Sequence, residues 1–442
     1  MTIITIFLIL QSILCFKILK KREISNVLAI SMVFYVFIWH FLPGLLALVF
    51  SYQALSSLLY YDVSEIEFTL LYVFESAALC LILFILLRLA KNFNTTEDFK
   101  QGWHQIKKSL VFLILFLCSI YLVYIASFGN YNYLEKNSAA FYGAGGGMII
   151  INFIGGIFLS SLVVLTLMAP KRTFILYFSF FLTCAFAGIS VLAGSRIAFV
   201  GPIVVLIFRY FNRFEFSARN YVLSFFVLLF TFYVILPMSH FIGQARGVGD
   251  LDVSLLARSG FDEGQGNKAA RMIFVKFDAF SGGISLIKRG GGLGSAGIKP
   301  YYGSALVFIP RFIWQSRPVA GSSDGSIYGH PTRIVPSLQG ADSDSYNVGV
   351  SSLAISLWQL SFLGFPVFVF SGVGFLLFIN RLLQSCFLNR VLGVYLLSIP
   401  SFHMLVPSPD VILKQIALVA PILALYGFHR RFRRKLLGGG RL

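Results

Sequence analysis

Long apolar runs, separated by short charged turns, decide what this chain can fold into. Residues 110–128 and 174–192 are two such runs. A helix of about 20 apolar residues crosses the hydrocarbon core of a bilayer. The 442-residue chain is 57% hydrophobic and only 12% charged, which is too little polar surface for a soluble fold of this size. The sequence therefore predicts an all-α polytopic membrane protein.

Hydropathy and flanking charge predict about eleven transmembrane helices, with the N-terminus outside and the C-terminus inside. Residues 1–238 hold the first eight predicted spans, 239–350 form a long external loop, 351–428 hold the last three spans, and 429–442 form a basic cytoplasmic tail. The predicted spans are residues 2–16, 24–50 (interrupted at Pro43-Gly44), 68–87, 110–128, 148–168, 174–192, 197–211, 221–238, 352–379, 391–406 and 411–428.

The positive charge of the chain follows from this topology. The formal net charge is +18. On the predicted map the cytoplasmic segments hold roughly 22 of the 36 Lys and Arg and roughly 4 of the 18 acids, as the positive-inside rule requires. We therefore expect a lipid bilayer as partner and no nucleic acid.

Metal and nucleophile motifs do not occur in the sequence. The cysteines, which have neither metal nor disulfide spacing, are Cys15, Cys80, Cys118, Cys184 and Cys386. H-E-x-x-H, G-x-S-x-G and P-loop patterns are absent as well. We expect no metal and no cofactor.

The interval 240–350 is the long stretch that is not built for lipid. It is rich in cations, although external segments normally carry few. Arg can bind a phosphate bidentately and Lys can meet it as a point charge, so a substrate on a lipid pyrophosphate would fit; alternatively, a long loop is translocated whatever its charge. The cations are Arg246, Arg258, Lys268, Arg271, Lys276, Lys288, Arg289, Lys299, Arg311, Arg317 and Arg333.

Two segments inside this loop have recognisable patterns. Residues 288–294 (K-R-G-G-G-L-G) are similar to a backbone nest for phosphate, and a flexible hinge is the alternative. Residues 269–280 could form a short helix near the membrane interface.

Polar residues also lie near the external ends of the predicted spans. Arg196 stands on a very tight turn between two spans, where it either serves function or anchors the interface. Glu75 lies about two turns into the third span. The remaining ones are His240, His403, and the pair Asp410 and Lys414 at helical i, i+4 spacing. Together they could form the floor of a pocket beneath the loop.

The loop and the turn resemble a known family. The stretch Pro310-Arg311-Phe312-Ile313-Trp314 with Arg317-Pro318 resembles the Pro-Arg-x-x-Trp-x-x-Lys-Pro segment in the outer loop of bacterial oligosaccharide repeat-unit polymerases, the Wzy-type O-antigen polymerases. Arg317 stands where Lys is usual. Further matching segments are Lys276-Phe277-Asp278, Tyr301-Tyr302-Gly303 and Gly194-Ser195-Arg196.

This resemblance implies a GT-C-like membrane glycosyltransferase in the bacterial inner membrane, with its active site facing the periplasm. Such an enzyme transfers the growing glycan from undecaprenyl pyrophosphate to a new lipid-linked repeat unit and works beside a flippase and a chain-length regulator. Cations, with Arg196 and Arg311 foremost, would stabilise the leaving pyrophosphate. Further substrate-binding candidates are Arg246, Arg271, Lys276, Lys288, Arg289, Arg317, Tyr301, Tyr302 and Trp314.

The general base remains open among Glu135, Asp278, His330 and Glu75. The aromatic side chains could stack on sugar rings or anchor the membrane interface. Two other functions share the same layout. One is an O-antigen ligase, which passes the finished glycan to the lipid A core. The other is a lipid-linked oligosaccharide flippase.

Overall fold

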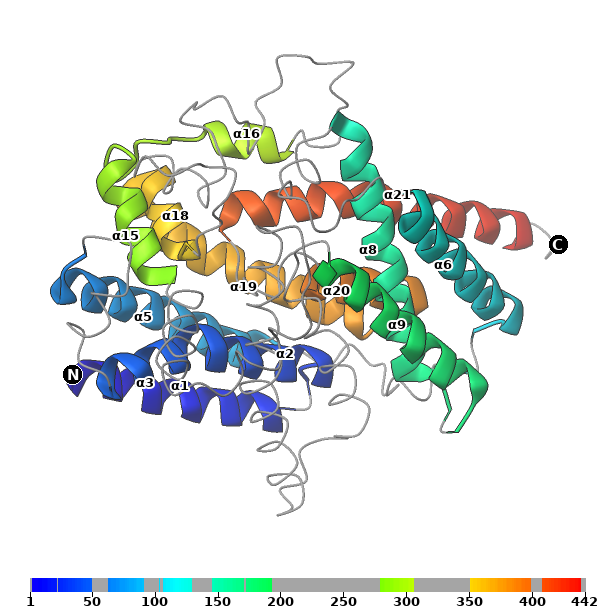
Figure 1. Cartoon of the computed structure of the whole chain (residues 1–442), viewed down its shortest axis with the longest axis horizontal. Helices are drawn as coiled ribbons and strands as arrows, with labels where there is room; N and C mark the ends of the chain where they lie inside the picture. The colour runs from blue at the N-terminus through cyan, green and yellow to red at the C-terminus, as the bar shows by residue number, and fades with distance from the viewer. Residues whose placement is uncertain are drawn as a thin grey trace, which may run out of the picture.

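The computed structural model describes residues 2–21, 23–49, 63–90, 103, 106–128, 145–170, 172–192, 279–305, 350–398 and 408–438, and the elements in these ranges are helices (Figure 1). They are α1 (Thr2–Lys20), α2 (Asn26–Val36), the π-helix η1 (Phe37–Phe41), α3 (Leu42–Val49), α5 (Glu65–Leu89), α6 (Lys108–Phe128), α8 (Gly145–Met168), α9 (Phe174–Leu192), α15 (Ala279–Arg289), α16 (Lys299–Ala305), α18 (Ser352–Leu360), the 3₁₀ helix η5 (Ser361–Leu363), α19 (Gly364–Leu383), α20 (Phe387–Ser398) and α21 (Pro409–Gly438). The predicted all-α class is confirmed for the described part of the chain.

Several of these helices are long and apolar enough to cross a membrane. Those segments are Thr2–Lys20, Val27–Leu45, Glu65–Leu89, Ser352–Leu383 and Pro409–Phe428. On α1 and α6, large apolar side chains such as Ile6, Ile9 and Phe116 are more than half exposed, as lipid-facing residues would be. The chain is therefore a membrane protein. The full count of eleven spans and the orientation stay predictions, and the predicted spans 197–211 and 221–238 lie outside the described residues.

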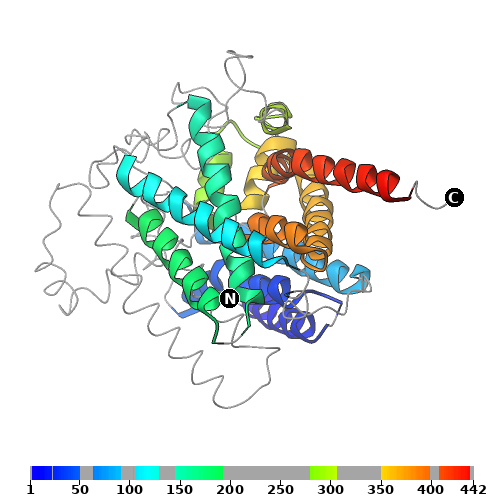
Figure 2. The ribbon, with the colours of Figure 1, turned by 90° about the vertical axis from the view of Figure 1, so that its right-hand side faces the viewer.

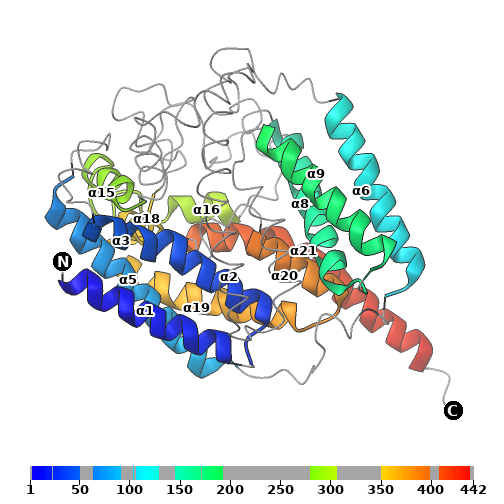
Figure 3. The ribbon, with the colours of Figure 1, turned by 60° about the horizontal axis from the view of Figure 1, so that its bottom comes forward.

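The second predicted span is modified at Pro43 without being broken. The π-helix η1 precedes Pro43, and the N–H of Leu42 donates to the carbonyl of Phe37, five residues earlier. Proline has no N–H to donate, so a helix can pass through it only when the hydrogen bonds around it rearrange. α2, η1 and α3 consequently follow one another in a single rod (Figure 3).

The ninth predicted span, 352–379, lies within the candidate span Ser352–Leu383, but it is not one continuous helix. It divides into α18 and α19 at η5, where Ser361 has a left-handed φ of 55°. Gly364 then begins α19 directly against the backbone of Ser356, a position that leaves no space for a Cβ atom. The break changes the direction of the chain between α18 and α19 (Figure 1).

Two predicted boundaries also shift. α8 begins at Gly145, three residues before the predicted span 148–168. α21 passes Pro421 and continues to Gly438, so that part of the predicted tail is helical backbone. Arg, Lys and Leu are good helix formers, and they extend the last helix beyond its apolar part.

The helices pack around three apolar clusters. The largest joins α1, α2, α5, α19 and α20. A second lies where α15 and α18 meet α5 and α1. The third is formed by α6, α8 and α9, here called the α6–α8–α9 unit, which is centred on Val111, Leu115, Leu162, Leu165 and Phe186. The unit stands beside the other helices (Figure 2), and α8 connects it to α20.

Candidate functional site

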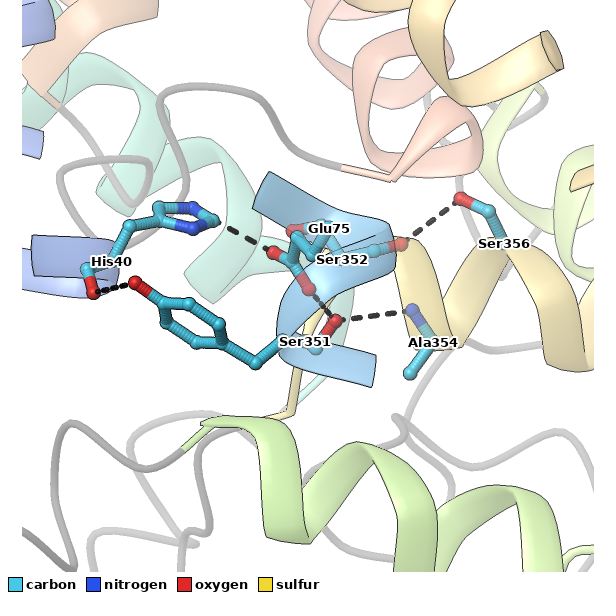
Figure 4. A network of polar contacts seen from close by, with 7 residues as sticks. His40, Glu75, Ser351, Ser352, Ala354 and Ser356 are labelled. Atoms are coloured by element: carbon cyan, nitrogen blue, oxygen red, sulfur yellow. Dashed lines mark hydrogen bonds and ion pairs between the residues drawn. The ribbon is translucent and has the colours of Figure 1, made fainter. Parts of the chain in front are cut away.

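A buried carboxylate lies in the middle of α5. Glu75 is 5% exposed. At 1.5 Å per residue it lies about 15 Å along the helix from Glu65. Its Oε2 accepts a hydrogen bond from the hydroxyl of Ser351, which is 276 positions away in the sequence (Figure 4). Burying a carboxyl group inside apolar helices is costly, so this position needs a reason.

Ser351 links the carboxylate to the beginning of α18. It is the N-cap of that helix, and its Oγ accepts from the N–H of Ala354 at 3.1 Å. The same hydroxyl donates to Glu75, so one side chain both caps the helix and binds the carboxylate. The N-terminal end of a helix carries partial positive charge, which favours an anion beside it.

His40 faces the other oxygen of Glu75 from η1. Its Nε2 lies 3.9 Å from Oε1 of Glu75, within ion-pair range but beyond a hydrogen bond. Its Nδ1 is buried and has no hydrogen-bond partner among the described residues. The hydroxyl of Tyr72 donates to the His40 carbonyl at 3.0 Å, and the ring of Tyr35 meets the imidazole edge-on, with centroids 5.6 Å apart. We call His40, Tyr72, Glu75 and Ser351 the polar cluster.

Helix α15, from the long loop, covers the polar cluster. Phe280 is 1% exposed, and its ring lies 5.8 Å from that of His40 and 5.2 Å from that of Tyr72. Gly283 permits this approach, because a Cβ atom there would lie 2.6 Å from the Cβ of Ala354. α15 therefore contacts the ring of His40 and both helices that carry the rest of the cluster.

Polar contacts also hold α15 in place. At its exposed end, Lys288 Nζ lies 2.7 Å from Oε1 and 2.8 Å from Oε2 of Glu67 on α5. Just beyond the helix, Trp358 Nε1 donates to the carbonyl of Gly290 at 2.9 Å. The ammonium of Lys288, a predicted substrate ligand, is thus engaged by a carboxylate in this structure.

The glycine segment 290–294 terminates α15. Gly291 and Gly292 have φ near 90°, and the N–H of Gly292 donates to Ile287, as in a Schellman motif. The N–H of Gly294 donates to the carbonyl of Leu357 on α18. Amides that already donate to carbonyls are not available to a phosphate, so the predicted nest is replaced by a helix terminus docked on α18. Arg289, another predicted substrate ligand, is the last residue of α15, and its side chain lies outside the described part of the structure.

The two predicted tyrosines lie on α16, which packs against α21. Tyr302 is 56% exposed. Within the described ranges, the buried hydroxyl of Tyr301 and one buried carboxylate oxygen of Asp410 have no hydrogen-bond partner. Burial raises the pKa of the Tyr301 phenol above its usual range, and the nearby charge of Asp410 adds to the rise.

The remaining predicted site residues lie outside the described residues. They are Arg196, Arg311, Glu135, Asp278, His330, Arg246, Arg271, Lys276, Arg317 and Trp314. Residues 269–278 of the predicted interfacial helix also lie outside this part, and α15 begins at Ala279. Within the described ranges no three His, Cys, Asp or Glu side chains gather into a possible metal site.

The sequence patterns singled out Glu75 but not its partners. His40 is an ionisable residue inside an apolar run, which is itself a signal of function in membrane proteins. Ser351 directly precedes an apolar helix, which is the usual signature of an N-cap. Neither signal predicts that these residues pair with Glu75, because the pairing joins segments that are far apart in the sequence.

Comparison with known proteins adds no relative. A scan against protein-family models, a search of curated proteins and a search of solved structures each find no significant match to this chain. The chemistry of the site must therefore be inferred from its own residues. A buried carboxyl group between a hydroxyl donor and an imidazole can accept a proton and release it.

Proposed function

We propose that this chain is a membrane glycosyltransferase that polymerises undecaprenyl-pyrophosphate-linked oligosaccharide repeat units at the periplasmic face of the inner membrane. The proposal rests on the resemblance around Arg196 and Arg311 to Wzy-type polymerases. It gains support from the polar cluster, which combines a buried carboxylate with a covering helix from the long loop. The reaction needs a base for the acceptor hydroxyl and cations for the leaving pyrophosphate.

The single structural observation that supports the proposal is the environment of Glu75. Of the four candidate bases it is the one whose surroundings are described. Its carboxylate is buried, oriented by Ser351 and faced by His40. In the proposed step Glu75 takes the proton of the acceptor hydroxyl. The acceptor oxygen bonds to the anomeric carbon of the growing glycan, whose bond to pyrophosphate breaks, and undecaprenyl pyrophosphate leaves with the electron pair.

The proposed roles of the cations follow from the charge of that leaving group. Arg196 and Arg311 stabilise the pyrophosphate as negative charge develops on it. Other loop cations hold the two lipid-linked substrates near one another, so that they accelerate the reaction by positioning the reactants. These cations are Arg246, Arg271, Lys276 and Arg317. Tyr302 and Trp314 provide faces on which sugar rings stack.

The test is reconstitution of the purified chain in liposomes that carry lipid-linked repeat units in the outer leaflet only. Elongated, lipid-linked glycans are expected to form without translocation. The variants Arg196→Ala and Arg311→Ala are expected to abolish elongation at normal protein levels. If wild-type protein yields no product longer than one repeat, the proposal is wrong.

One observation favours transport as a second candidate function. His40 and Glu75 are an ionisable pair inside candidate spans, and such pairs also occur on proton paths of transporters. A flippase would move labelled lipid-linked repeats to the inner leaflet of the same liposomes without lengthening them. An O-antigen ligase would require lipid A core as acceptor, so adding that acceptor to the assay distinguishes the third function.

A further inference from the structure

His40 is held in an unusual way for a buried histidine. Its backbone carbonyl is bound by Tyr72, and its ring contacts Tyr35 and Phe280, so the position of the imidazole is well defined. A histidine with a structural role commonly donates one ring N–H to a backbone carbonyl or a carboxylate. Here Nδ1 has no hydrogen-bond partner in the part of the chain that the structure describes, and Nε2 lies 3.9 Å from Glu75. The packing fixes the ring while both nitrogens keep capacity for hydrogen bonds.

The surroundings of His40 leave few groups that could exchange a proton with it. From α5 it is faced by Glu75 and by Tyr72, whose hydroxyl is already donated to the His40 carbonyl. From α2 it is faced by Tyr35, and from α15 by the apolar ring of Phe280. In the described part of the chain Glu75 is the carboxylate beside the imidazole. A proton on Glu75 therefore has a defined receiver.

We infer that His40 and Glu75 act as a proton-transfer pair, in which His40 receives the proton that Glu75 removes from the acceptor hydroxyl. This rests on the proposed function of Glu75 as the base. The O–H bond of the acceptor breaks and its proton passes to the carboxylate. The 3.9 Å separation between Oε1 of Glu75 and Nε2 of His40 then closes to hydrogen-bond distance, and the proton passes to Nε2. Glu75 returns to the carboxylate form beside an imidazolium. The imidazolium has to lose this proton before the next turnover, which restores the neutral imidazole.

The structure gives two reasons for a second proton acceptor behind the base. A protonated Glu75 cannot accept the next proton until it has passed the first one on, and His40 lies at ion-pair distance to receive it. An imidazolium at ion-pair distance restores the carboxylate and compensates its charge. The open Nδ1 provides the second nitrogen that a relay needs, whereas a histidine with a purely structural role needs none.

The experiment uses the reconstituted full chain and compares wild type, His40→Gln, His40→Asn and Glu75→Gln. His429→Gln, the same exchange in the basic tail, is the control. The elongation rate is measured from about pH 5 to about pH 9, because histidine side chains usually change their protonation state within this range. In parallel, infrared difference spectra of the protein without substrate follow the carbonyl band of protonated Glu75, assigned by its loss in Glu75→Gln.

We expect the wild-type rate to fall at low pH, where the pair already holds its proton. His40→Gln and His40→Asn lower the rate and remove or displace that pH transition, and they change the pH range over which the Glu75 band appears. His429→Gln keeps the wild-type profile. If both His40 variants retain the wild-type pH profile and the wild-type band, the proton-transfer pair is refuted and His40 is a packing residue.

Failure of the proposed function would look different. In that case wild-type protein would give no elongated glycan at any pH, while the infrared titration would still report whether His40 and Glu75 exchange a proton. Variants that do not fold are recognised by loss of the monodisperse elution of wild type. If neither His40 variant folds, the infrared titration of the wild-type protein is the deciding measurement. If its Glu75 carbonyl band does not change between about pH 5 and about pH 9, the inference is wrong.

Discussion

The α6–α8–α9 unit and the polar cluster beneath α15 both bury polar side chains among apolar helices, but they bind them differently. In the unit the polar groups are neutral hydroxyls: Thr166 and Thr183 lie 2.8 Å from carbonyls four residues earlier in their own helices, and a 2.9 Å hydroxyl–hydroxyl bond joins Thr166 to Ser179. In the polar cluster the carboxylate of Glu75 comes from α5, the imidazole of His40 from η1, and the hydroxyl of Ser351 from the N-cap of α18. A hydroxyl bonded to its own helix costs little to bury, whereas an ionisable pair is expensive. The difference separates a region that only has to pack from one that has chemistry to perform.

The largest effect is expected from Glu75→Gln, a nearly isosteric change that removes the base. Elongation in the liposome assay should fall by about 100-fold or more, as expected for loss of a general base. Thr166→Val in the α6–α8–α9 unit, which removes the 2.9 Å bond to Ser179, should leave the rate unchanged. Glu65→Gln, on the exposed first turn of α5, is the matched carboxylate control. Equal rates in Glu75→Gln and Glu65→Gln would remove Glu75 from the reaction.

A pair of glycine substitutions compares the packing of the two regions. Gly283→Ala introduces a Cβ atom 2.6 Å from Ala354 and 3.1 Å from Leu71, and overpacking of this kind costs about 1–3 kcal/mol. Gly188→Ala in α9 meets nothing within 4 Å, and alanine favours a helix over glycine by roughly 0.5–1 kcal/mol. Thermal unfolding in detergent should therefore shift in opposite directions. A shift of the same sign in both would show that α15 does not sit tightly on the cluster.

Much of the unit, and little of the cluster, could be predicted from the sequence. The bounds of α9 agree with the predicted span 174–192, and those of α6 differ by two residues at the start, because apolar run length and flanking charge are local signals. The division of α18 from α19 was missed, since Ser361 resembles any serine in an apolar run and its φ depends on the packing of Gly364. Glu75 stood out as an acid in a span. Its pairing with His40 and Ser351 is a tertiary fact that no spacing encodes.

A smaller effect is expected from Ser351→Ala, which removes the cap of α18 and a hydrogen-bond donor to Glu75. Loss of an N-cap costs about 1 kcal/mol. Elongation should also slow, because the carboxylate is no longer oriented. Ser356→Ala, on the same helix, loses only a 2.9 Å bond to the Ser352 carbonyl and should change neither quantity much. Ser351→Thr keeps the hydroxyl and should recover most of both; if it behaves like alanine, steric fit rather than hydrogen bonding governs the position.

The smallest effect concerns the exposed ion pair that connects α15 to α5. The side chains of Lys288 and Glu67 are 45% and 33% exposed, and exposed pairs contribute about 0.2–1 kcal/mol. A double-mutant cycle with Lys288→Met and Glu67→Gln should give a coupling energy of that size, which decreases as salt rises to about 1 M. Methionine retains the apolar stem of the lysine, so the cycle reports the charge and its hydrogen bonds. A coupling of zero at both salt concentrations would mean that the exposed ion pair adds nothing to the packing of Phe280 and Gly283 and to the Trp358–Gly290 hydrogen bond, which would then hold α15. The cover over the polar cluster would then depend on buried contacts, as the α6–α8–α9 unit does, and the contrast between the two regions would be confined to the buried groups themselves.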